Sequence, residues 1–271
     1  MEMVRKPAVA GMFYPNDRRE LGNVVSVLLD QAVPEQKFNV NGLVAPHAGY
    51  VYSGKTAAYG YSQIKGKKFS TVIILSPSHR EYFDGVCIYE GDAYLTPLGR
   101  VPVDHEISDA LCTEDDLIYR GINGHGPEHA IEVQLPFLQS VLGEFNLVPV
   151  VMGDQSEKNI NTLAEKLSAV MRDDILVIAS SDLSHFYSQE HADEMDAIAG
   201  KHINNFDFDA LQRDLDAHRT EACGGGLITT MLKAYSAKGF DKARVLYRND
   251  SSEASGDKSE VVGYLTAVVY K

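Results

Sequence analysis

The sequence contains no tryptophan and only three cysteines among its 271 residues. The cysteines, Cys87, Cys112 and Cys223, are an odd number at wide spacing. They form no Cys-x-x-Cys pair, which excludes a zinc finger built from cysteine pairs. An odd set of dispersed cysteines predicts reduced thiols, as in a cytoplasm, rather than a disulfide framework.

Positive charge and long apolar runs are also scarce. The chain has 25 Lys and Arg against 38 Asp and Glu, which gives a net charge of −13. This balance argues against nucleic acid or an anionic membrane surface as the partner. No run approaches the roughly 20 apolar residues of a membrane helix, and the N-terminus lacks the apolar core of a signal peptide. We therefore expect a cytoplasmic protein with no membrane or nucleic-acid partner.

The sequence does contain a regular alternation of apolar strands and amphipathic helices. Runs that predict strands lie at 42–46, 70–75, 147–153, 175–179, 244–247 and 261–270. Strands that alternate with helices predict an α/β sandwich with a mixed central sheet. The last two strands are expected to pair antiparallel. No linker rich in proline or serine divides the chain, so residues 1–271 are expected to form a single domain.

Capping residues and prolines predict where several helices begin or end. Asp17, Asp104 and Ser156 each precede apolar residues at helical spacing, and we interpret them as N-caps. Pro127 follows a glycine and predicts a further helix start. Pro136 is then expected to kink or break that helix.

Three of the predicted strands run into loops that carry a histidine. His47, His79 and His185 follow the runs at 42–46, 70–75 and 175–179. Ligands bind outside the carboxyl ends of strands in open α/β sheets. The spacing of His47 and His79 matches two adjacent strand–helix units, so they are expected to meet at neighbouring strand ends. A lone loop histidine is more often a surface residue, and the matched positions are what favour a functional site.

Cys223 directly precedes three glycines and an apolar helix. One interpretation is a buried cysteine beside a glycine turn. The other is a reactive thiolate, because a helix N-terminus lowers the pKa of a thiol. A thiolate with two imidazoles would make a three-ligand site that leaves positions open on a catalytic metal.

Two acid–histidine pairs are further candidates for catalysis. Asp182 and His185 are three residues apart on one face of a turn, where the aspartate would hold the histidine tautomer and the histidine would move a proton. The alternative is an Asx turn that caps a helix. His129 and Glu132 form a similar pair, and a satisfied helix surface explains them equally well.

Six short motifs, in the same order, are those of one known family. They are Ala10–Pro15, Ala45–Tyr50, Ser76–His79, Glu128–Glu132, Ser180–His185 and Ala222–Gly226. Over nearly its full length the chain resembles the Memo family, also called AmmeMemoRadiSam system protein B. Microbial members of that family are associated with radical-SAM proteins and proteins of the AMMECR type, so the resemblance implies a shared pathway.

The Memo family in turn resembles the class III extradiol dioxygenases, which are non-haem Fe(II) enzymes that cleave catechol rings. This likeness implies a three-layer α/β fold with metal ligands at His47, His79 and Cys223. It places Asp182 and His185 beside the metal, with His185 as the acid/base. The dioxygenases have a carboxylate where this chain has Cys223. A thiolate has the same charge as a carboxylate but is a softer ligand, which shifts the metal preference toward copper, zinc or thiolate-bound iron.

Three functions follow from this sequence. The leading hypothesis is a mononuclear metal pocket, with iron first and copper or zinc as alternatives, that performs redox or oxygen-dependent chemistry on a small organic molecule. The second is a thiol hydrolase with Cys223, His185 and Asp182 as nucleophile, base and orienting acid. The third is a non-catalytic module that uses the same pocket to bind a peptide or protein.

Overall fold

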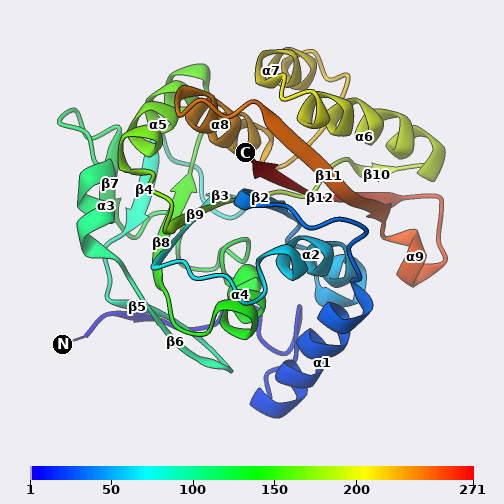
Figure 1. The fold of residues 1–271 in the computed structure, drawn as a ribbon, viewed down its shortest axis with the longest axis horizontal. Coiled ribbons are helices and arrows are strands. Elements are labelled where there is room, and N and C mark those ends of the chain that lie inside the picture. The colour runs from blue at the N-terminus through cyan, green and yellow to red at the C-terminus, as the bar shows by residue number, and fades with distance from the viewer. Residues whose placement is uncertain (1) are drawn as a thin grey trace.

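The computed structural model describes residues 2–271, and its centre is a nine-stranded mixed sheet (Figure 1). The strand order is β10-β12-β2-β9-β3-β8-β4-β7, and β11 pairs with β12. The strands are β2 (Val40–Ala45), β3 (Thr71–Pro77), β4 (Val86–Tyr89), β7 (Ile118–Gly121), β8 (Asn146–Met152), β9 (Ile175–Ser180), β10 (His185–Tyr187), β11 (Lys242–Asp250) and β12 (Val261–Tyr270). β2, β9, β3 and β8 are parallel to one another, whereas β12 and β4 run antiparallel to them. The predicted α/β fold with a mixed sheet is confirmed, as is the antiparallel pairing of β11 with β12.

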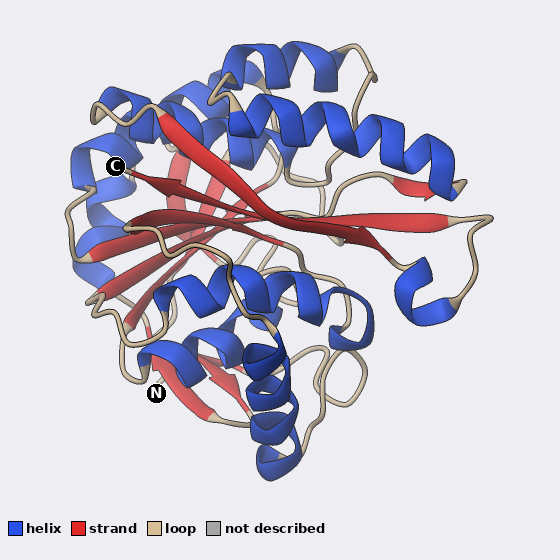
Figure 2. Ribbon diagram, turned by 45° about the vertical axis from the view of Figure 1, so that its right-hand side comes forward, coloured by secondary structure: helices blue, strands red, loops and turns tan. Residues whose placement is uncertain are grey.

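Helices cover both faces of this sheet and give three layers, seen nearly edge-on in Figure 2. One face carries α1 (Arg18–Gln31), α2 (Tyr50–Ile64) and α4 (Leu135–Leu142). The other carries α3 (His105–Leu111), α5 (Glu157–Val170), α6 (Gln189–Asn204), α7 (Phe208–Asp216) and α8 (Gly225–Ala237). A short helix, α9 (Ser252–Ser255), lies between β11 and β12, and a second sheet consists of β1 (Val4–Arg5), β5 (Ala93–Thr96) and β6 (Gly99–Pro102). None of the helices in residues 2–271 is long and apolar enough to cross a membrane.

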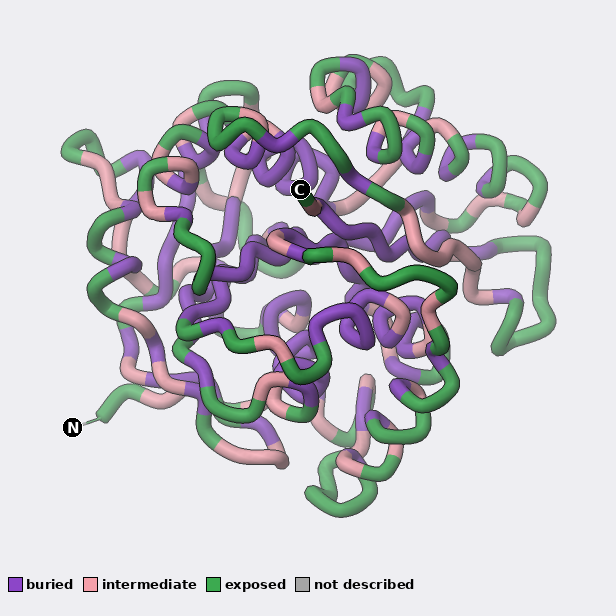
Figure 3. The backbone as a smooth tube through the Cα atoms, viewed as in Figure 1, coloured by how far each residue is buried: buried purple, intermediate pink, exposed green. Residues whose placement is uncertain are grey.

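The central strands are buried along their whole length (Figure 3). Every residue of β3 and β9 is buried, because helices pack on both faces of the sheet and leave no side of these strands to solvent. Successive side chains enter opposite cores: Leu43 packs with α1 and α2, and Val44 packs with α5 and α8. The loops that leave this rigid region are therefore held in fixed positions.

The predicted N-caps are confirmed, but the predicted proline positions are wrong. Asp17, Asp104 and Ser156 each accept a backbone hydrogen bond at the start of α1, α3 and α5. Pro127 begins no helix, since residues 126–131 form a loop that leads into a short 3₁₀ turn, η1 (Glu132–Gln134). Pro136 lies in the first turn of α4. A proline there removes no helical hydrogen bond, so it starts a helix instead of breaking one.

Candidate metal centre

Three parallel strands end at one edge of the sheet in loops that carry the candidate site residues. β2, β3 and β9 end two residues before His47, His79 and Asp182, respectively. Because these strands are parallel, their carboxyl ends and the following loops lie at the same edge. The expectation that His47 and His79 follow neighbouring strands is wrong, because β9 lies between β2 and β3.

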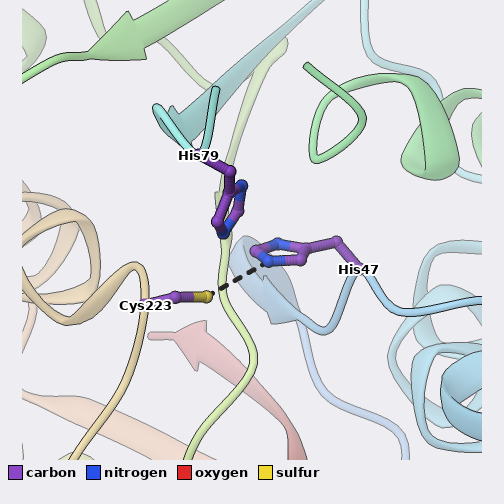
Figure 4. Close-up of side chains that lie close together, drawn as sticks. All are labelled: His47, His79 and Cys223. Atoms are coloured by element: carbon purple, nitrogen blue, oxygen red, sulfur yellow. Dashed lines mark hydrogen bonds between the residues drawn. The ribbon is translucent and has the colours of Figure 1, made fainter. Parts of the chain in front are cut away.

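The side chains of His47, His79 and Cys223 converge at this edge, as Figure 4 shows. One ligand atom from each lies within 4.8 Å of the other two. The Cys223 Sγ atom is 3.1 Å from Nε2 of His47, and the two imidazole centroids are 5.0 Å apart. We call these three residues the open cluster. The structure thus brings together all three residues expected to bind a metal.

The tautomer of His47 is set by Ser180. The Ser180 hydroxyl donates to the carbonyl oxygen of Ala130 at 2.8 Å, so it can only accept from the other groups around it. It accepts from Nε2 of Gln134 at 2.8 Å and from Nδ1 of His47 at 2.9 Å. The proton of His47 is therefore on Nδ1, and Nε2 offers a lone pair to the open cluster. Burial and the neighbouring His79 lower the pKa of His47 to about 3, so the ring is neutral near pH 7.

Glu128 orients His79 in the same way. The His79 backbone N–H donates to Oε2 of Glu128 at 2.7 Å, and ring atom Nδ1 lies 2.9 Å from Oε1. A carboxylate oxygen accepts, so Nδ1 donates and Nε2 is left free. Burial raises the pKa of Glu128, but hydrogen bonds from His79 and the Ala130 amide outweigh burial and lower it to about 2. The carboxylate is therefore charged at neutral pH.

Cys223 is held against the end of β9. Its Sγ accepts from the backbone N–H of Asp182 at 3.2 Å, and its own N–H donates to the Asp182 carbonyl at 3.2 Å. A Cβ at the next residue, Gly224, would lie 2.5 Å from the Ser180 oxygen, so only glycine lets the loop approach this closely. The expected lowering of the thiol pKa is not found. Burial and the nearby Asp182 raise the pKa of Cys223 instead.

Asp182 and His185 do not form the expected pair. Oδ1 of Asp182 accepts the His47 backbone N–H at 2.7 Å, and Oδ2 is 4.0 Å from Nε2 of His47. Within residues 2–271, no hydrogen bond joins Asp182 to His185. Burial raises the pKa of Asp182. The aspartate therefore fixes the loop that carries His47, and His185 stands at the start of β10 on the wall of a cavity beside it.

His129 lies at the site, but Glu132 does not. The His129 ring stacks on His79 at 4.9 Å between centroids and lies 5.4 Å from the ring of His47. Its buried Nδ1 makes no hydrogen bond in the described chain, but it lies 3.4 Å from Oε1 of Glu128. The Glu132 carboxylate instead accepts from Arg5, Tyr14 and the backbone N–H groups of residues 8 and 9. The expected His129–Glu132 pair is therefore wrong, because the segment is a loop and not the helix that would align them.

The supporting residues Glu128, Ser180 and Gln134 were not expected from the sequence. The Glu-His-Ala motif does place Glu128 beside His129, which could have indicated it as the carboxylate of the site. Nothing in the sequence connects Ser180 with His47 or Gln134 with Pro46, since these contacts span 133 and 88 positions. Only the folded chain shows these contacts.

A cavity of about 510 Å³ opens beside the open cluster, and we call it the side cavity. Its wall includes His129, Asp182 and His185, together with aromatic side chains and the loop that precedes β12. Its size matches pockets that bind small organic molecules. A second cavity, of about 680 Å³, adjoins it at Met12 and Phe13 and is lined by α1 and the start of α2.

Comparisons with known proteins agree with this fold and identify the family. The crystal structure of an uncharacterized Escherichia coli protein superimposes with a TM-score of 0.55, covering 84% of this chain and 98% of that one at 12% identity, which shows the shared fold. MEMO1 family proteins of Thermotoga neapolitana and Methanobrevibacter smithii are 37% and 36% identical, and both alignments cover 98% of this chain, with 100% and 99% of those proteins. The family model described as Memo-like protein matches residues 5–268. The chain therefore belongs to the Memo-like protein family.

Proposed function

We propose that this protein binds one metal ion at His47, His79 and Cys223 and acts on a small organic molecule in the side cavity. Iron(II) is the metal we favour, with copper or zinc as alternatives because the thiolate is a soft ligand. The proposed chemistry is redox or oxygen-dependent. A reducing compartment such as the cytoplasm suits this proposal, since Cys87, Cys112 and Cys223 are all free.

One observation carries the proposal: both histidines have Nδ1 occupied by a hydrogen bond and an unprotonated Nε2 beside the same sulfur. Nδ1 of His47 donates to Ser180, and Nδ1 of His79 donates to Glu128. Histidines that bind metals donate their second ring nitrogen in this way, which fixes the tautomer. Ligand atoms at about 2.0–2.3 Å from one ion lie up to about 4.6 Å apart, close to the 4.8 Å limit within which these three lie. Two imidazoles and one thiolate leave coordination positions for a further ligand.

When bound, the metal would supply a Lewis acid or one-electron centre beside the side cavity. The chain itself provides the groups that position the metal ligands and line the side cavity. Asp182 anchors the His47 loop, and His129 lies 12% exposed between the open cluster and the side cavity. Burial lowers the pKa of His129 to about 4, so it is a neutral base near pH 7. His129 and His185 are the residues we expect to accept or donate a proton to a bound molecule.

The test is metal content after anaerobic purification and reconstitution with iron(II), copper or zinc. We expect about one metal ion per chain in the wild type and less than about a tenth of that in His47→Ala, His79→Ala and Cys223→Ser, because each removes one of only three protein ligands. His105→Ala is the control, since His105 is the first residue of α3 and its Nδ1 pairs with Arg120 away from this edge. Full metal occupancy in the three ligand variants would contradict the proposal.

The thiol-hydrolase alternative has less support. The imidazole in contact with Cys223 is that of His47, and burial raises the pKa of the thiol. A nucleophilic cysteine needs the opposite, namely a lowered pKa and a base that is free to accept its proton. Slow alkylation of Cys223 in metal-free protein at pH 7, compared with a small free thiol, is the expected result, and rapid alkylation would restore the alternative.

A binding module is the second candidate, favoured by exposed apolar side chains around the site. Met12, Val51 and Phe186 are 73%, 80% and 70% exposed. Exposed apolar side chains that cluster mark interaction surfaces. Peptide binding that survives complete metal removal, and is lost in a Met12→Asp and Phe186→Asp double variant, would favour this function over the metal-dependent one.

A further inference from the structure

The side cavity combines acidic and aromatic walls without a positively charged side chain. Asp182, Asp257 and Glu260 supply its carboxyl groups. Within residues 2–271, no lysine or arginine lines it, although Lys258 stands in the same loop outside the wall. A wall of this kind attracts cations and repels carboxylates and phosphates.

Four aromatic rings line the same space from its floor to its rim. Tyr264 is 2% exposed, whereas Tyr52 and Phe186 are 44% and 70% exposed, and Phe13 packs edge-on against His129 at 4.9 Å. Aromatic faces bind ammonium groups through their ring quadrupole, and they do so best where carboxylates are close. The rings also offer an apolar surface to the organic part of such an ion.

The backbone conformation at the rim of the side cavity indicates that Phe186 is held in a specific position. Phe186 has a φ of +63°, in the left-handed region that a bulky residue adopts only when its surroundings require it. The strain coincides with a register shift in the β10–β12 pairing between His185 and Tyr187. This bulge turns the Phe186 ring to the mouth of the side cavity.

Asp182 provides a second, independent sign of a ligand. Its side chain is 6% exposed, and one oxygen accepts the His47 amide. Its other oxygen makes no hydrogen bond within the described chain and lies 4.0 Å from Nε2 of His47, and the residue lines the side cavity. A carboxyl oxygen of a largely buried side chain normally has a hydrogen-bond partner, so this oxygen is placed to accept from a bound molecule.

We propose that the side cavity binds an organic ammonium ion. Its cationic group lies among Asp257, Glu260 and the exposed rings at the rim, and its organic body extends inward to Asp182 and His129. A volume of about 510 Å³ admits a small molecule of this class. This inference deepens the proposed function because it names the class of substrate. It rests on the proposed function only in assuming that the bound ion is a substrate of the metal site.

Three phenols of matched shape test the charge preference. Tyramine is cationic, 4-ethylphenol is neutral and 4-hydroxyphenylacetate is anionic, and none has the paired hydroxyls that chelate a metal. Isothermal titration at physiological salt should show tyramine binding about tenfold or more tighter than the anion, with the neutral phenol between them. Equal affinities, a reversed order, or no binding of tyramine would overturn the proposal.

Variants show whether the preference for tyramine comes from the residues of the side cavity or from the overall negative charge of the protein. Asp257→Asn with Glu260→Gln should reduce the preference for tyramine to about threefold or less, and Glu260→Lys should reverse it. Glu165→Gln with Asp173→Asn, at two exposed residues outside the side cavity, removes the same two charges and should keep the full preference. An equal loss in this control would show that the preference comes only from the net charge of −13.

Metal-free protein and His79→Ala are titrated in parallel, and metal content is measured on the same samples. If the wild type binds no metal even after reconstitution but keeps its tyramine selectivity, the proposed function is wrong and this inference stands. Stoichiometric metal with no charge preference would do the reverse.

Discussion

Two polar clusters depend on the short stretch 128–132, and they differ in how fully their atoms are paired. In the first, which we call the closed cluster, Glu132 meets Arg5 and Tyr14. The carboxylate is fully buried and accepts from the Arg5 guanidinium, the Tyr14 hydroxyl and the backbone N–H groups of residues 8 and 9, at 2.7 and 3.0 Å for the last two. Every donor comes from the N-terminal segment, so this cluster attaches that segment to the fold.

The open cluster is nearly as buried at His47 but exposed at His79, and its acceptor atoms are only partly paired. Nε2 of His47, Nε2 of His79 and Sγ of Cys223 face one another without enough protons to pair them all. Nδ1 of the neighbouring His129 makes no hydrogen bond within residues 2–271 and has only the Glu128 carboxylate near it, at 3.4 Å. Buried groups in proteins are normally satisfied. The comparison teaches that the closed cluster pairs its own atoms, whereas the open cluster leaves acceptor atoms that the proposed metal ion would pair.

The largest expected effect comes from breaking the closed cluster. Glu132→Ala leaves the Arg5 charge buried without its partner, which typically costs about 3–5 kcal/mol of unfolding free energy. Urea denaturation measures this loss. The surface variant Glu165→Ala should stay within about 0.5 kcal/mol of the wild type. The metal content of folded Glu132→Ala should stay near that of the wild type, and loss of metal there would show that the two clusters are not separable.

Removing the support of His79 should weaken metal binding with less effect on stability. Glu128→Gln keeps the shape of the side chain but removes the negative charge of the carboxylate that accepts from His79. Loss of such a supporting carboxylate typically costs about 10–100-fold in metal affinity, and competition with a chelator measures it. Glu81→Gln is the matched control, because Glu81 also bonds loop amides but lies outside the cluster. Unchanged affinity in Glu128→Gln would show that His79 needs no orientation.

The glycine that admits Cys223 gives a subtler test. A Cβ at Gly224 would lie 2.5 Å from the Ser180 oxygen, so Gly224→Ala must displace the loop and should cost about 1–3 kcal/mol. Metal affinity should fall with it. Gly126→Ala is the control, since a Cβ there meets nothing within 4 Å. Thermal unfolding and metal titration of both variants provide the comparison, and equal behaviour would refute the close-approach argument.

The smallest expected effect is the release of a proton when the metal binds. The pKa of Cys223 is raised, so the thiol is protonated at pH 7, whereas His47, with a pKa of about 3, is already neutral. A thiolate ligand must lose its proton, so metal binding should release about one proton. Affinity should then rise about tenfold per pH unit near neutrality. Calorimetry in buffers of different ionisation enthalpy measures this number, and a count near zero would exclude the thiolate as a ligand.

The helix N-caps and the strand ends were accessible to sequence analysis because their causes are local. Asp17 and Ser156 bond to amides two or three residues away, so the short-range pattern contains the whole interaction. The histidine loops could be found because apolar runs fix where strands stop. The error at Pro127 arose because a Gly-Pro pair is compatible with either a loop or a helix start, and distant packing decides between them. Pro136 was then misplaced as well, because the helix that it was expected to break begins only at Leu135.

The sequence by itself therefore determined the α/β class, the strand ends and the residue types available for a metal. It could not assign the partners of those residues. That β9 separates β2 from β3, that Ser180 sets the tautomer of His47 and that Glu128, not Glu132, supports the site were decided by the tertiary structure. The physical reason is that hydrogen bonds between residues far apart in the chain exist only once the sheet has aligned its loops at one edge.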